Sequence, residues 1–234
     1  MASIVKKRLI FKAKEGAIPN PIDILLTFCD VDDVKFKRDG AKLVAWKVIK
    51  FPAQRSASAR VTYRREFCFI HPQVNTGNII FPSTNIPLKL GEQTSLIDET
   101  GTGDAEFAKS TNFTDKTSIR VENKTTVMQD IAVGMSQGHA TEPDIIYWYE
   151  DVGVDQFRVF KPLTVLFPYA VPNYDKGVLA TQGLPDKPMD PIDLLSLKPE
   201  TTWYLTYEGS GGTYKLTMTE PLDEEDRDAG DGRQ

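Results

Sequence analysis

The fold is decided by the stretch Ala59-Arg-Val-Thr-Tyr-Arg-Arg-Glu-Phe-Cys-Phe-Ile70. Its odd-numbered positions from 61 are apolar, with Arg65 as the one misfit: Val61, Tyr63, Phe67 and Phe69. Its even-numbered positions up to 66 are polar: Arg60, Thr62, Arg64 and Glu66. Side chains alternate between the two faces of an extended strand. The pattern therefore predicts an antiparallel β-strand with one buried face and one face toward solvent.

Other short apolar runs predict further strands on both sides of this stretch. They cover residues 4–12, 22–28, 42–51, 119–127, 145–149, 157–167 and 178–181. Near residue 210 a hairpin is predicted, because two alternating arms flank a glycine-rich turn at 208–212. Its alternating side chains are expected to share one core-facing surface: Trp203, Leu205, Tyr207, Tyr214, Leu216 and Met218.

Short strands with frequent turn residues, and no sustained helical stripe, are typical of an all-β protein. We expect a single antiparallel β-sandwich, of jelly-roll or immunoglobulin-like type, spanning residues 1–221.

Two segments depart from the strand pattern. Residues 91–110 are polar and contain glycines, which predicts a long surface loop. Residues 222–234 are rich in acids and hold one large apolar residue, which predicts a flexible tail.

The charge of the chain is divided along its length. Residues 1–66 contain 15 Lys and Arg against 7 Asp and Glu, a balance of +8. Residues 67–234 contain 13 against 26, a balance of −13, so the whole chain carries −5. Such asymmetry indicates partners or self-association. The alternative is that basic and acidic strands offset one another inside one domain.

The basic side chains fall in two consecutive predicted strands. They are Lys42, Lys47, Lys50, Arg55, Arg60, Arg64 and Arg65. If these two strands pair, several cations would share one solvent-facing surface, and we expect Lys47, Arg60 and Arg64 to bind a partner there. Arginine binds carboxylate, sulfate and phosphate groups in a two-pronged geometry. A net charge of −5 argues against nucleic acid. An acidic protein surface fits better, either on another copy of the chain or in its own tail.

The run Tyr147-Trp148-Tyr149-Glu150-Asp151 suggests a second binding mode. Sugar rings stack on aromatic side chains, and neighbouring carboxylates accept hydrogen bonds from sugar hydroxyls. These five residues could form a lectin-like carbohydrate site. The opposing interpretation is that the aromatic side chains belong to the core, because at least one of the three must point inward on a strand.

Catalytic signals are weak. The chain has only two histidines, His71 and His139, and neither has metal-ligand spacing to a second His or a Cys. Cys68 lies three residues from His71, which on a strand places the two on opposite faces. No nucleophile-elbow or phosphate-loop motif is present. We therefore predict no cofactor, no metal and no catalytic residue. An enzyme that uses carboxylates or Tyr in a new way is a further alternative.

Location and function are predicted from the apolar runs of the chain and from the surroundings of its two cysteines. No segment approaches the roughly 18 apolar residues of a membrane span, and no secretory apolar run follows Met1–Arg8. Cys29 and Cys68 lie among apolar residues, where a reduced thiol is the common state. These features favour a non-catalytic cytoplasmic protein that binds or self-assembles through a basic sheet face at about residues 42–65.

Overall fold

The structure is a computed structural model, which describes residues 5–28, 41–74, 80–98, 105–136, 142–174, 184, 187–209 and 212–220. These residues form eighteen strands and no helix. None of them belongs to a helix long and apolar enough to cross a membrane. The predicted all-β class is confirmed. The predicted strand at 178–181 and the predicted tail at 222–234 lie outside the described residues, as do Cys29 and His139.

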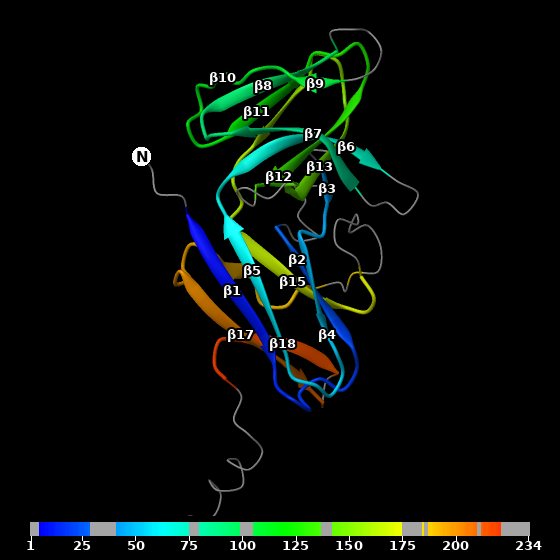
Figure 1. The fold of residues 1–234 in the computed structure, drawn as a ribbon, viewed down its shortest axis with the longest axis vertical. Coiled ribbons are helices and arrows are strands. Elements are labelled where there is room, and N and C mark those ends of the chain that lie inside the picture. The colour runs from blue at the N-terminus through cyan, green and yellow to red at the C-terminus, as the bar shows by residue number, and fades with distance from the viewer. Residues whose placement is uncertain are drawn as a thin grey trace, which may run out of the picture.

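Two four-stranded sheets make up one half of the molecule (Figure 1). The first, called the β1 sheet, has the order β18 (Thr213–Thr217), β17 (Glu200–Glu208), β1 (Lys6–Ala13), β5 (Ala57–Arg64). The second, called the β2 sheet, has the order β16 (Ile192–Asp193), β15 (Val165–Val171), β2 (Ile22–Thr27), β4 (Lys47–Phe51).

Two five-stranded sheets make up the other half. The β12 sheet has the order β3 (Ala41–Leu43), β13 (Asp144–Val152), β12 (Gln129–Met135), β6 (Phe67–Val74), β7 (Ile80–Leu88). The β11 sheet has the order β10 (Thr111–Asn112), β8 (Glu92–Ile97), β11 (Ile119–Asn123), β14 (Phe157–Phe160), and β9 (Glu106–Phe107) pairs with β8.

The two halves follow one another along the long axis of the molecule (Figure 1). One continuous cluster of buried apolar side chains includes residues from all four sheets, such as Phe11, Ile24, Phe69 and Val121. The predicted β-sandwich packing is confirmed. Most strand pairs are antiparallel, but β1 pairs with β17 and β8 pairs with β11 in parallel. These partners are distant in sequence, so no hairpin signal could have predicted their direction.

The stretch 59–70 forms two strands where one was predicted. β5 ends at Arg64 and β6 begins at Phe67, and the chain passes from one half to the other between them. The backbone N–H of Arg65 donates to the Val5 carbonyl at 3.1 Å, and the Glu66 carbonyl accepts from the Ser136 N–H at 2.9 Å. The misfit at Arg65 therefore marks the crossing between sheets. The four apolar side chains of the pattern all lie in the core.

The predicted hairpin is present as β17 and β18, with Leu205 opposite Leu216 and Tyr207 opposite Tyr214. Of the six side chains expected to face the core, Leu205 and Leu216 are buried, and Trp203 and Tyr214 pack against the core. Tyr207 is half-buried against Tyr214, and Met218 lies beyond β18 and is 60% exposed. The prediction of a long loop at 91–110 was wrong for residues 92–97 and 106–107, which form β8 and β9. The polar sequence of β8 conceals an alternation in which Thr94 and Leu96 are buried.

Candidate binding face

The predicted basic residues do not lie on one pair of strands. β4 belongs to the β2 sheet and β5 to the β1 sheet, so Lys47 is separated from Arg60 and Arg64. The Lys47 ammonium lies 2.7 Å from the Asp144 carboxylate, which is 3% exposed and belongs to the other half. Lys47 therefore compensates a buried charge where the two halves meet. The idea of a single basic face made by residues 42–65 needs correction for this reason.

β5 pairs with β1 instead, and that pairing assembles a basic face. The antiparallel register places Lys6 opposite Arg64, Ile10 opposite Arg60 and Lys12 opposite Ser58. Leu9, Phe11, Val61 and Tyr63 are buried, so the alternate residues point away from the core. We call the outward side chains of these two strands the basic face: Lys6, Arg8, Ile10, Lys12, Ser58, Arg60, Thr62 and Arg64.

Five of these eight side chains are cationic, and few of them are compensated. Arg8 forms an ion pair with Glu200 on β17, at 2.7 Å. Across the described part of the chain, Lys6, Arg60 and Arg64 form no ion pair with an acid. Lys6 and Arg64 lie directly opposite one another, and like charges in this position destabilise a sheet. The buried Nε of Arg64 also lacks a hydrogen-bond partner. An anion at this face would therefore relieve the repulsion between Lys6 and Arg64.

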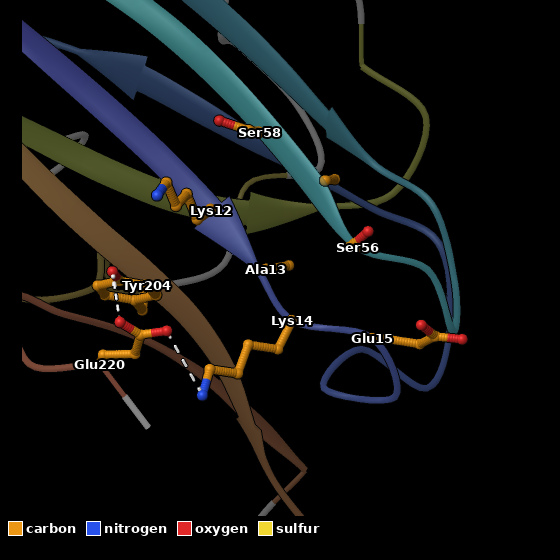
Figure 2. Close-up of a pocket in the computed structure, with 9 residues that line it drawn as sticks. Lys12, Ala13, Lys14, Glu15, Ser56, Ser58, Tyr204 and Glu220 are labelled. Atoms are coloured by element: carbon orange, nitrogen blue, oxygen red, sulfur yellow. Dashed lines mark hydrogen bonds and ion pairs between the residues drawn. The ribbon is translucent and has the colours of Figure 1, made fainter. Parts of the chain in front are cut away.

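An open pocket of about 520 Å³ lies at one end of the basic face (Figure 2). Lys12, Lys14, Ser56, Ser58, Tyr204 and Glu220 are among its lining residues. The Tyr204 hydroxyl donates to Glu220 Oε2 at 3.1 Å, and Lys14 Nζ lies 3.5 Å from Glu220 Oε1. Lys12 Nζ is 5.9 Å from the centre of the Tyr204 ring. The pocket thus contains two carboxylates of the chain itself. Glu220 lies between a cation and a phenol, and Glu15 is a second acidic lining residue.

The electrostatics keep the Tyr204 phenol protonated. Partial desolvation and the hydrogen bond to the nearby Glu220 carboxylate raise the pKa of Tyr204, while Lys14 opposes the shift. Because the raised pKa lies further from neutral pH than the ordinary value near 10, the hydroxyl remains a donor. That donor is already engaged by Glu220, so the further donors of the pocket are the Lys12 and Lys14 ammonium groups and the Ser56 and Ser58 hydroxyls.

The residues predicted for carbohydrate binding lie on β13, and their aromatic rings are mostly enclosed. Trp148 and Tyr149 are each 4% exposed, and Tyr147 packs edge-on against Phe160. Glu150 is paired with Lys42 at 2.6 Å, and the Lys42 ammonium also lies 5.5 Å from the centre of a Trp148 ring. Asp151 is exposed at the end of the run. The structure brings these five residues together, but it presents their acidic end rather than a flat aromatic surface.

Of the histidines and cysteines considered for catalysis, the structure describes His71 and Cys68. The His71 Nε2 lies 3.0 Å from Gln129 Oε1. Cys68 is 1% exposed, and burial raises the pKa of its thiol to about 12, so it is a neutral thiol at physiological pH. Within the described ranges, no three His, Cys, Asp or Glu side chains are grouped as metal ligands.

Sequence reasoning found Arg60 and Arg64 but missed the β1 cations. The signal was available in residues 6–13, where Lys6, Arg8 and Lys12 alternate with Leu9 and Phe11. What the sequence did not contain was the choice of β1 rather than β4 as the partner of β5. Comparison with family models, curated proteins and solved structures finds no match to this chain.

Proposed function

We propose that this protein is a non-catalytic binding protein whose basic face on β1 and β5 holds an acidic polypeptide. The observation that carries this proposal is the set of five cations on two paired strands, of which only Arg8 has an acidic ion-pair partner among the described residues. Because β1 and β5 are paired strands of the β1 sheet, the backbone positions of these cations are fixed before a partner arrives. A preformed surface loses less conformational freedom on binding.

The geometry of the face suits an extended acidic segment. Outward side chains on one strand recur every second residue, a spacing of about 6.6 Å. An extended partner that carries acids at alternate positions has the same spacing, so Lys6, Arg8 and Lys12 can each meet one carboxylate. Nucleic acid is the poorer match, because the remaining chain from residue 67 carries −13 and would repel a long polyanion. The acidic partner can be another protein or a second copy of this chain.

We place this activity in the cytoplasm. The free thiol of Cys68 supports this location, since reduced cysteines persist in reducing compartments.

The proposal is tested by titrating a fluorescent peptide of about twelve glutamates with the full chain and reading anisotropy. The variant Arg60→Glu reverses an exposed cation at the centre of the face, and it should weaken binding about tenfold or more. The matched control is Lys109→Glu, which makes the same change in net charge at an exposed residue of the other half. This control should bind within about twofold of the wild type.

Salt provides the second arm of that titration. Binding should weaken steeply between about 0.05 and 0.5 M salt, because exposed charges are screened over shorter distances as salt rises. Equal losses in Arg60→Glu and Lys109→Glu would show that net charge alone attracts the peptide, and would overturn the proposed face. Absence of binding by the wild type at low salt would overturn the proposed function.

A further inference from the structure

We propose that the acidic segment 222–234 is an intramolecular ligand of the basic face and competes there with the acidic partner. This inference rests on the proposed function, since it assigns a competitor to the same surface. Its starting point is Glu220, which lines the pocket at the end of the face, two residues before the segment begins (Figure 2).

Glu220 shows that a carboxylate is accommodated at this end of the face. Its two oxygens are divided between the Tyr204 hydroxyl, at 3.1 Å, and the Lys14 ammonium, at 3.5 Å. The Glu220 side chain is 60% exposed, so this contact directs the chain rather than contributing much stability. Lys12, the nearest cation of the basic face, also lines the pocket. The segment after Glu220 therefore starts beside the first cation that it would meet.

The charge of the segment complements the charge of the face. Residues 222–234 hold two arginines and six acids, namely Asp223, Glu224, Glu225, Asp226, Asp228 and Asp231. The net charge of the segment is thus −4. Five cations stand on the face, and Glu200 offsets one of them. The net charge of the segment is therefore equal and opposite to the uncompensated charge of the basic face, so the segment can neutralise the face.

The segment is also long enough to cover the face. Fourteen residues follow Glu220, and an extended chain of that length spans about 46–50 Å. The eight residues of β1 span about 26 Å. Starting at Lys12 and Lys14, the segment can pass Arg8 and Arg60 and reach Lys6 and Arg64 at the far end.

Attachment to the same chain makes a weak contact effective. A short flexible connection gives an effective concentration in the millimolar range. A segment whose free peptide would bind the face with a Kd of about 0.1 mM would therefore occupy it about nine-tenths of the time. The apparent affinity for an external acidic partner would fall by about tenfold as a result.

Zero-length carbodiimide cross-linking of the full chain, followed by peptide mass spectrometry of the monomer fraction, tests this contact. The reagent couples carboxylates to amines that touch. Links from Lys6 or Lys12 to the acids of 222–234 are expected at low salt and should be lost at high salt. The Lys14–Glu220 pair is an internal control for the chemistry. Recovery of that link without any link to Lys6 or Lys12 would overturn the inference, as would links found only in a dimer fraction.

A binding experiment separates this inference from the proposed function. In a full-length variant, the six acids of the segment become Asn or Gln, and the glutamate peptide is titrated as before. The variant should bind the peptide about tenfold more tightly than the wild type, and adding Arg60→Glu should abolish that gain. Equal, tight binding by the wild type and the variant would overturn the competitor while leaving the proposed function intact. Failure of both to bind would overturn the proposed function itself.

Discussion

The outer faces of the β1 sheet and the β12 sheet differ sharply, although one stretch of sequence supplies a strand to each. On β5, the outward residues Arg60, Thr62 and Arg64 are polar and at least partly exposed. On β6, the corresponding even-numbered residues Cys68 and Ile70 are apolar and buried. They belong to a separate buried cluster with Val44, Ala132, Ile145 and Trp148. A free sheet face is available for binding, whereas a covered one contributes to stability.

The largest expected effect lies on the covered face. Trp148→Ala removes a large side chain that is 4% exposed, so it should lower the free energy of unfolding by about 3–5 kcal/mol. Urea denaturation followed by circular dichroism measures this loss. A variant as stable as the wild type would show that Trp148 is not a core residue, and it would return the run at 147–151 to consideration as a carbohydrate site.

A smaller effect is expected when the same face is overfilled. A Cβ atom at Gly134 would collide with Ile70 Cδ1 and would lie 3.0 Å from Cys68 Sγ. Gly134→Ala should therefore destabilise the protein by about 1–3 kcal/mol, measured as above. Gly209→Ala is the matched control, because a Cβ there meets nothing within 4 Å. The control should show no loss, because Gly→Ala lowers the entropy of the unfolded chain. Similar losses in the two variants would mean that packing against Ile70 is not the cause.

The smallest effect on stability is expected on the basic face. Arg60→Thr removes an exposed side chain that has no acidic partner among the described residues, and it should change the free energy of unfolding by less than about 0.5 kcal/mol. Affinity for the glutamate peptide should nevertheless fall. If Arg60→Thr cost as much stability as Trp148→Ala, the contrast between the two faces would be wrong.

The sequence predicted local features well and long-range features poorly. Alternation in residues 59–70 and in the hairpin at 200–217 follows from side-chain geometry, which each strand carries in its own residues. Arg65 even marked the point where the chain changes sheets, although as a single misfit it gave no reason to expect a break. Pairing between β1 and β5 is a contact between distant segments, and nothing in either strand distinguishes it from a pairing with β4.

The candidate binding face shows the same difference between local features, which the sequence predicts, and long-range contacts, which it does not. Arg60 and Arg64 could be predicted to share one face because their charge and their position on a strand are local properties. Lys47 was misassigned, since its partner Asp144 is nearly a hundred residues away and belongs to the other half. Trp148 could be read either as a surface platform or as a core residue, because a strand in a sandwich can be covered on both faces. Only the packing of Cys68, Ile70 and Ala132 around it decides the matter.

The proposed binding of acidic polypeptides to β1 and β5 is tested most directly by amide chemical-shift mapping of the isotope-labelled full chain during titration with the glutamate peptide at low salt. We predict that shift changes concentrate on residues 6–12 and 58–64, with smaller changes around the pocket at Tyr204. Changes that concentrate at residues 147–151, or that spread evenly over the basic side chains of both halves, would contradict the account.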